Sequence, residues 1–294
     1  MKTILRPALT MIELILVIVI LGIVASIGAE IIANVYEGYI IQRAQHRASI
    51  KTELAATQIA NRLAYAIPGT VVRKAGLTQV GQNINEVSAI NYNILQWVGT
   101  DADSFKAISA PGAGAGAAAL QRHPGWSGFC DVANSANLTL STPGSNLGLA
   151  STIIANLGGN INNAEVYFPL YKRLTNYGTP AAPVMLPLVN YGVNAAGPGA
   201  ETITLDSPLN NFSEHYKLAW TSYALEAKNN GDLVLHYSFT PQRDAAINDN
   251  PQILLRNVTT FRFRGDGRTI RFKICVRENI GDGNITLCKE KAVF

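Results

Sequence analysis

The sequence has 294 residues, of which 48% are hydrophobic and 15% charged, so it can bury a core and is not an intrinsically disordered chain. Its 24 Lys and Arg residues against 20 Asp and Glu residues leave a net charge of +4 that is dispersed along the chain, and nucleic acid is therefore not predicted as a direct partner. Three cysteines are too few for a disulfide scaffold and lack the CxxC spacing of a zinc site.

An apolar segment runs from Leu9 to Ala29, with Glu13 as its only charged residue. A helix of about 21 residues is long enough to span a bilayer core of about 30 Å. Two basic residues, Lys2 and Arg6, precede the segment, and the first charged residues after it are acidic. By the positive-inside rule we expect a cytoplasmic N-terminus, with the rest of the chain on the other side of the membrane.

Glu13 is unusual in such a segment. A carboxylate in an apolar span costs about 2–3 kcal/mol at the centre of a bilayer, and it usually persists only with a partner. The sequence has no Lys, Arg or His between Leu9 and Asn34, so the apolar turns of the same helix provide no cation. We therefore expect the partner of Glu13 to come from another molecule.

Two simpler interpretations account for part of this segment. A secretory signal peptide also begins with a short basic stretch and an apolar run, but this run is longer than the usual signal core. In addition, Ile27 occupies the position three residues back from a cut after Ala29, where a small residue is expected. A plain membrane anchor explains the length of the segment. Neither interpretation explains Glu13.

The residues around Glu13 resemble a known processing signal. Residues 8–14 read ALTMIEL, with a short basic leader before them and an apolar run after them, and this is similar to the class III signal of type IV pilins and pseudopilins. In that family a prepilin peptidase cuts before the first apolar residue and methylates the new amine. A glutamate at the fifth mature position then pairs with the terminal amine of a neighbouring subunit.

The resemblance implies cleavage between Ala8 and Leu9, N-methylation of Leu9 and an assembly role for Glu13. Cleavage would create a cation at the edge of the apolar run, and this cation can neutralise Glu13 of an adjacent helix. The chain departs from the family at Ala8, where Gly is usual, and at Glu30, where many members have a proline that kinks the helix.

The predicted helix continues beyond the apolar segment. No proline occurs from Ile31 to Ile67, and Pro68-Gly69 then stops the helix. One helix from about Thr10 to Ala66 would be ~85 Å long. Apolar residues recur in it at helical spacing, and we interpret them as the surface that docks the helix on a globular head. They are Ala44, Ala48, Ala55, Ile59, Leu63 and Ala66.

Residues 69 to about 215 are rich in Gly, Asn, Ala and Pro, and turn residues separate their short apolar runs. These runs lie around Ile90–Val98, Ala164–Leu174 and Val184–Val193. Residues 111–117, PGAGAGA, lack the Lys-Ser/Thr of a phosphate-binding loop and are interpreted as a low-complexity loop. We derive no function from this stretch.

The C-terminal part, residues 216–294, has the alternating pattern of an antiparallel meander. Its strands are predicted at Tyr216–Ala227, Leu233–Phe239, Ile253–Arg264 and Thr269–Val276, separated by Asn- and Gly-rich turns. The alternation of inward and outward positions assigns two sets of side chains. Val258, Phe261, Phe263, Ile270, Phe272, Ile274 and Val276 should point inward, and Arg262, Arg264, Arg271 and Lys273 should point to solvent.

A two-residue hairpin loop at Gly281-Asp282 would place Cys275 directly opposite Cys288. Counting from the closing pair puts the two cysteines on a non-hydrogen-bonded pair, whose Cα atoms approach to ~4.5 Å. We therefore predict a Cys275–Cys288 disulfide, which suits an oxidising compartment. Cys130 is left over and could be buried, free or paired with another chain, and a buried thiol is favoured.

No catalytic group, cofactor site or metal site is predicted, because the four histidines are scattered without ligand or triad spacing and Cys130 has no base near it in the sequence. An enzyme is accordingly not expected.

The order of elements resembles the larger minor pseudopilins of type II secretion and the large minor pilins. This resemblance implies an α+β fold of the type IV pilin kind, with a leader at residues 1–8 and a long helix at 9–67, membrane-spanning over 9–29 and periplasmic over 30–67. That helix packs on an antiparallel sheet head at 68–294.

The resemblance also implies a structural subunit that starts in the bacterial inner membrane and ends in a pilus or pseudopilus. Its expected partners are the prepilin peptidase, the inner-membrane assembly platform and other subunits. The alternative is a membrane-anchored or secreted periplasmic binding protein that assembles into no filament.

Overall fold

The computed structural model describes residues 10–86, 92–109, 122–169, 190–196, 201–210, 212–248, 251–280 and 283–293. The chain divides into two compact units. The first comprises Met1–Ile50 and Arg277–Leu287, and the second comprises Lys51–Val276 and Cys288–Phe294. The fold is α+β, with one long N-terminal helix and antiparallel sheets, as the sequence predicted. The low-complexity loop predicted at residues 111–117 lies outside the described residues.

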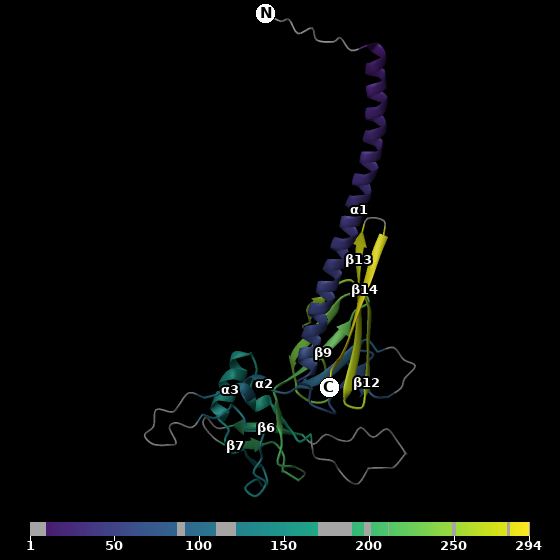
Figure 1. Ribbon diagram of the computed structural model, residues 1–294. Coiled ribbons are helices and arrows are strands. Elements are labelled where there is room, and N and C mark those ends of the chain that lie inside the picture. The colour runs from purple at the N-terminus through teal and green to yellow at the C-terminus, as the bar shows by residue number, and fades with distance from the viewer. Residues whose placement is uncertain are drawn as a thin grey trace, which may run out of the picture. The chain divides into compact units, whose positions relative to one another are not determined.

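The long helix α1 extends from Met11 to Leu63 without interruption (Figure 1). Its 53 residues correspond to about 80 Å at the rise of an α-helix. At its end the amide of Ala66 donates to the carbonyl of Leu63, a tighter turn than the helix itself. Gly69 follows with a φ of 87°, in the left-handed region that glycine adopts readily. The helix predicted at 9–67 is therefore present, and it is shorter than predicted by two residues at its start and four at its end.

The second part of α1 has one buried face. Ala55, Ala56, Ile59 and Leu63 are at most 3% exposed, whereas their neighbours on the opposite face are open to solvent. Their spacing of three to four residues is the helical period, so one stripe of the helix enters the core. The docking stripe expected from the sequence is confirmed at Ala55, Ile59 and Leu63.

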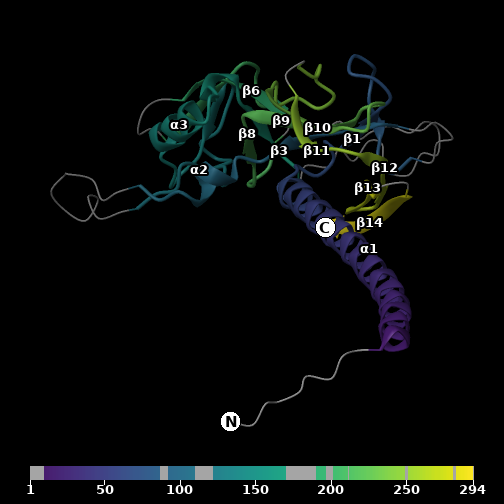
Figure 2. The same cartoon turned by 90° about the horizontal axis from the view of Figure 1, so that it is seen from above.

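The buried stripe of α1 packs on a six-stranded antiparallel sheet. Its central strand β3 is buried along its entire length, and Trp97 of β3 stacks on Tyr223 of β9 at a ring-centroid distance of 5.8 Å. Leu95, Trp97 and Leu225 belong to the same apolar cluster as Ile59. Figure 2 shows these strands next to one another, and their order is β11-β10-β9-β3-β1-β2. The bounds are Val72–Lys74 for β1, Gln82–Asn83 for β2, Ile94–Gly99 for β3, Thr221–Ala227 for β9, Leu233–Phe239 for β10 and Gln252–Leu255 for β11.

A five-stranded sheet, in the order β4-β7-β6-β5-β8, has a separate apolar cluster. The helix α3 adds Leu147, Ala150 and Ile154 to that cluster, and the side chain of Asn146 caps its first turn by accepting from the amide of Leu149 at 3.1 Å. The bounds are Ala102–Lys106 for α2, Thr139–Ser141 for β4, Leu147–Asn156 for α3, Ile161–Asn163 for the 3-10 turn η2, Glu165–Tyr167 for β5, Asn190–Ala196 for β6, Thr202–Leu205 for β7 and Lys217–Ala219 for β8.

The third sheet has the order β12-β13-β14, with bounds Val258–Asp266, Thr269–Ile280 and Gly283–Val293. Phe261, Phe272 and Ile274 on its inner face are at most 6% exposed and belong to the cluster that contains Ile59. The predicted basic residues lie on the outer face and are exposed, with Arg262 opposite Lys273 and Arg264 opposite Arg271. The two faces therefore alternate as the sequence predicted.

The single meander expected over residues 216–294 is not what the structure contains. The strands of this region lie in three sheets: β8 in the five-stranded one, β9 to β11 in the six-stranded one and β12 to β14 in the third. The separation after β11 occurs at Asn257, which has a φ of 60°. Asn adopts this left-handed conformation more readily than most other non-glycine residues. One such residue changes the direction of the chain, so that β12 does not continue the six-stranded sheet to which β11 belongs.

Candidate functional site

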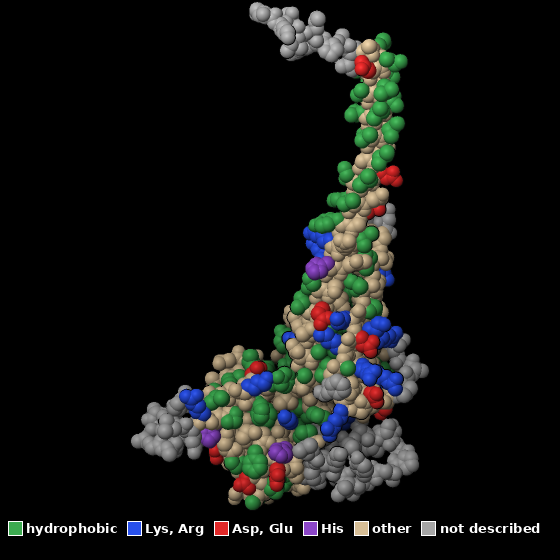
Figure 3. Space-filling model, in the orientation of Figure 1, with side chains coloured by type: hydrophobic (Ala, Val, Ile, Leu, Met, Phe, Trp, Pro, Cys, Tyr) green, Lys and Arg blue, Asp and Glu red, His purple; other side chains and the backbone are tan. Residues whose placement is uncertain are grey.

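The apolar segment at the start of α1 is uncovered in the described structure. The large apolar side chains from Met11 to Ile27 are between 52% and 82% exposed. Figure 3 shows hydrophobic side chains around this part of the helix. Among the described residues, α1 is the one helix long and apolar enough to cross a membrane, judged by length and composition. A helix that is apolar on every side needs lipid or other helices around it.

Glu13 lies in the first turn of this segment and contacts Thr10. Its Oε2 atom accepts from the backbone N–H of Thr10 at 3.1 Å and from the Thr10 hydroxyl at 3.1 Å. The Thr10 carbonyl in turn accepts from the amide of Leu14, which begins the helical ladder. A carboxylate in this position also interacts favourably with the positive end of the helix dipole.

Within the described residues, these contacts leave the charge of Glu13 without a cation from the turns that follow it. The first basic residue after it in the sequence is Arg43, thirty residues further on. That separation is about 45 Å along an α-helix. The other two predicted residues of the processing signal, Ala8 and Leu9, lie outside the described residues. The sequence analysis did not anticipate the Thr10 contact, although the T-x-x-E spacing of a capping box was a visible signal for it.

The structure contains the predicted Cys275–Cys288 disulfide, which joins β13 to β14. The Cα atoms of the two residues are 4.0 Å apart, close to the spacing expected for a non-hydrogen-bonded antiparallel pair. The two loop residues predicted between these strands, Gly281 and Asp282, lie outside the described residues. The thirteen-residue separation closes the end of the hairpin into a small covalent loop. The bond therefore fixes the pairing of the last two strands.

Two salt bridges join the last strand of this hairpin to α1. The Nζ atoms of Lys289 and Lys291 on β14 each lie 2.7 Å from a carboxylate oxygen of Glu53 on the helix. Lys291 also donates to the Thr57 hydroxyl at 2.8 Å. The hydrogen bonds from Lys289 and Lys291 lower the pKa of Glu53 to about 2, so its carboxylate stays ionised. These contacts connect the C-terminal strand to the second part of the helix.

The remaining thiol is buried, as expected. The Sγ atom of Cys130 lies 3.5 Å from the Ser135 hydroxyl, and burial raises the pKa of the thiol, which disfavours the reactive thiolate. Of the histidines, His236 is fully buried and contacts Glu226 at 3.2 Å and the carbonyl of Asn248 at 2.8 Å. Within the described ranges no group of three or more His, Cys, Asp or Glu side chains could hold a metal ion.

Sequence reasoning missed one buried ion pair. Lys74 on β1 is 1% exposed, and its Nζ atom lies 2.7 Å from Oδ1 of Asp244 and 3.0 Å from the carbonyl of Ala245. Asp244 also accepts from the amide of Gly81 at 2.8 Å. These bonds attach the segment after β10 to β1, which lies three strands away from β10 in the six-stranded sheet. A single lysine and a single aspartate far apart in the sequence provide no pattern that would predict their pairing.

Comparison with known proteins adds nothing to these observations, because no family model, no curated protein and no solved structure matches the chain. The likeness to pilins accordingly depends on the residues themselves. The coarse architecture, a long apolar N-terminal helix followed by an antiparallel sheet head, is compatible with that likeness.

Proposed function

We propose that this chain is a structural subunit of the pilin and pseudopilin kind. It is made with a leader at residues 1–8, and a prepilin peptidase cleaves it between Ala8 and Leu9 and methylates Leu9. Before assembly the subunit is held in the bacterial inner membrane, with its N-terminus in the cytoplasm and its head in the periplasm. An inner-membrane assembly platform then moves it into a pilus or a type II secretion pseudopilus.

One observation carries this proposal: a fully apolar helical segment with a single carboxylate in its first turn. From Met11 to Ile27 the apolar side chains are exposed on every side of α1, which favours burial among lipids and then among other helices. The Glu13 carboxylate accepts from Thr10, and the next basic residue in the sequence is far beyond its reach. A plain anchor needs no such carboxylate, whereas a helix bundle uses it to pair with a cation of a neighbour.

Assembly would provide that cation. The new amine of Leu9 in one subunit neutralises Glu13 of the adjacent one, so the pair forms only after the leader is removed. Small residues such as Gly22 and Ala25 let neighbouring helices approach closely, as small residues do in membranes. Helix packing and charge pairing then act together to select subunits in the correct register.

We further propose a minor rather than a major subunit. The head beyond residue 68 is large and contains two separate apolar clusters of substantial size, which suits a tip or priming position better than dense repeated stacking. Quantitative immunoblotting of sheared filaments tests this point. A chain that makes up most of the filament protein would contradict it.

The decisive test is mass spectrometry of the N-terminal peptide of the native protein, taken from isolated membranes and from sheared material. We expect a peptide that begins at methylated Leu9 in both fractions. A variant with Ala8→Gly serves as a control, because it has the usual residue of the family before the cut and should be processed at least as fully. An intact Met1 would indicate a plain anchor, and a start near Glu30 a secreted protein, and either result would overturn the proposal.

A further inference from the structure

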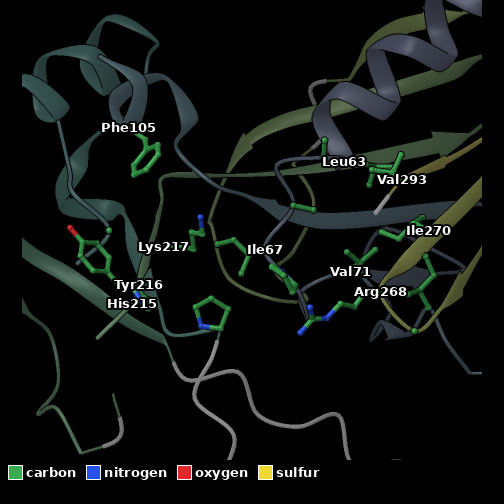
Figure 4. A pocket seen from close by; sticks show the side chains of 18 of the residues that line it. Leu63, Ile67, Val71, Phe105, His215, Tyr216, Lys217, Arg268, Ile270 and Val293 are labelled. Atoms are coloured by element: carbon green, nitrogen blue, oxygen red, sulfur yellow. The ribbon is translucent and has the colours of Figure 1, made fainter. Parts of the chain in front are cut away.

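A cavity of about 680 Å³ lies beside the C-terminal end of α1, and all of its lining residues belong to the second unit. Figure 4 shows Phe105, Tyr216 and Lys217 on one side of it and Leu63, Ile270 and Val293 on the other. Its lining therefore comes from both large apolar clusters of the head. A volume of this size is typical of sites for small molecules.

The wall of the cavity is largely apolar. Leu63 and Ile67 line it from the end of the helix, Ile84 and Ile270 from the sheet side, and Trp126 from the other cluster. The indole N–H of Trp126 already donates to the carbonyl of Asp101 at 2.9 Å, so the ring presents carbon atoms to the cavity. Such a surface favours the alkyl part of a ligand over water.

The charged groups of the lining are all of one sign. Lys217 and Arg268 line the cavity, and no Asp or Glu is among the described residues that do so. Tyr216 provides no negative charge either, because burial raises the pKa of its phenol to about 12 and its hydroxyl shares a hydrogen bond of 2.7 Å with Thr142. A positive potential in an apolar site attracts an anionic head group.

Neighbouring groups position the Lys217 side chain and the backbone turn that carries Arg268. The Nζ atom of Lys217 lies 5.8 Å from the ring centroid of Phe105, which also lines the cavity. Arg268 follows Gly267 in the turn between β12 and β13, and the Asn85 side chain fixes this turn by donating to the Gly267 carbonyl at 3.2 Å. Figure 4 shows Lys217 on the side of Phe105 and Arg268 on the side of Ile270. The arrangement is therefore built from several elements rather than from one exposed loop.

We propose that this cavity binds an amphiphilic carboxylate, with an alkyl chain against the apolar wall and the carboxylate at a cation of the lining, Lys217 or Arg268. A charge-assisted hydrogen bond to a cation of the lining fixes the head group, and it distinguishes the ligand from a neutral amphiphile of the same length. The inference concerns the head alone and does not depend on filament assembly. It gives the subunit a capacity to bind a small molecule that a purely structural role does not require.

The test uses the full chain in nanodiscs of phosphatidylcholine and a dodecanoate probe with a photoreactive group at the end of its alkyl chain. Crosslinked residues are mapped by mass spectrometry. The apolar segment over residues 11–29 is an internal reference, because the probe partitions into the bilayer and labels that segment without saturation. We expect saturable labelling around Leu63, Trp126 and Ile270, which excess dodecanoate suppresses and dodecanol does not.

The double variant Lys217→Met with Arg268→Met should weaken saturable labelling about tenfold or more, since the charge-assisted bond to the carboxylate and the positive charge of the lining are lost. The matched control is Arg264→Met with Lys273→Met, which removes the same charge from the outer face of β12 and β13 and should leave the affinity unchanged. Ala64→Phe, at an exposed position of the lining, should reduce binding by filling space. Circular dichroism of each variant verifies that the head is folded.

Four results would overturn the proposal. The first is labelling confined to residues 11–29, and the second is equal protection by dodecanol and dodecanoate. The third is an unchanged affinity in a folded Lys217→Met and Arg268→Met protein. Saturable labelling of the cavity by an apolar peptide with a free carboxylate, in place of dodecanoate, would likewise reject the assignment of a small amphiphile.

Discussion

The two ends of α1 differ in the exposure of their apolar side chains, although both belong to one continuous α-helix. From Met11 to Ile27 the large apolar side chains are at least 52% exposed, whereas Ile59 and Leu63 near the other end are 1% and 3% exposed. The first part is apolar all round, and the second is apolar on one stripe only. The helix is continuous, so the difference is entirely one of side-chain pattern.

This comparison shows how one helix can have two kinds of partner. A one-sided stripe is covered by a sheet of the same chain, and the protein then gains the free energy of burial on folding. An all-round apolar surface cannot be covered by one sheet, so it needs lipid or several other helices. The single carboxylate in that surface, Glu13, adds a requirement for a cation in the same surroundings.

The strongest way to test the first part is Glu13→Val. On the proposed function, the variant inserts into the membrane normally but loses its pairing with the Leu9 amine. We expect its amount in sheared filaments to fall about tenfold or more, since a neutral partner cannot replace the ion pair. Glu37→Val, which removes an exposed carboxylate outside the apolar segment, is the control and should assemble. Normal incorporation of the Glu13→Val protein would contradict the assembly mechanism.

The strongest test of the second part is Ile59→Ala. This change leaves a cavity in the cluster formed with Trp97 and Leu225, and it should lower the free energy of unfolding by about 2–5 kcal/mol. Denaturant titration with tryptophan fluorescence measures the effect, because Trp97 is fully buried. Ile18→Ala removes the same atoms from a side chain that is 60% exposed, and it should change head stability by less than about 0.5 kcal/mol. Equal losses of unfolding free energy in the two variants would show that the two parts of α1 do not differ in their contribution to head stability.

The disulfide provides a smaller effect at the C-terminal hairpin. Replacing Cys275 and Cys288 together by Ser should lower the free energy of unfolding by about 3 kcal/mol, because a short loop is no longer closed in the unfolded chain. Reduction of the wild-type protein should shift its unfolding midpoint in the same direction. The double variant should not respond to reductant. A response of equal size in that variant would assign the effect to another group.

The smallest expected effect concerns Glu53 and its two lysines. Its pKa of about 2 lies below its ordinary value of 4.5, so the stabilising contribution is present above the ordinary value and is lost as pH falls toward about 2. Lys289→Met with Lys291→Met should raise the pKa of Glu53 toward its ordinary value, measured by carboxyl NMR titration. Lys273→Met, on the outer face of the sheet, should leave it unchanged. A low pKa that persists in the double variant would contradict the contact with β14.

Local features of the sequence were sufficient for several parts of the structure. The stop at Pro68-Gly69 predicted the end of α1, and the alternation along residues 258–276 predicted which side chains face the core. The pairing of Cys275 with Cys288 followed from counting outward from a two-residue loop. Each of these predictions used information within one helix or one hairpin, where the period of the backbone is fixed.

Longer-range features were not predicted. The helix α3 and the five-stranded sheet arise in the Gly- and Asn-rich middle, whose apolar runs are too short to distinguish helix from strand. The separation of β11 from β12 depends on the left-handed conformation of Asn257, which no periodicity reveals. The pairing of Lys74 with Asp244 joins residues 170 positions apart. The contact between Thr10 and Glu13 was not predicted either, although the two residues have the T-x-x-E spacing of a capping box.

The sequence by itself determined the long helix, its two side-chain patterns, the isolated carboxylate of Glu13 and the pairing of Cys275 with Cys288, because these follow from backbone periods and local charge. Only the tertiary structure decided how the strands divide among three sheets, which lysine is buried and where Lys217 and Arg268 line a cavity. These features depend on contacts between distant segments, and their free energy is distributed over many partners. No single stretch of the chain contains that information.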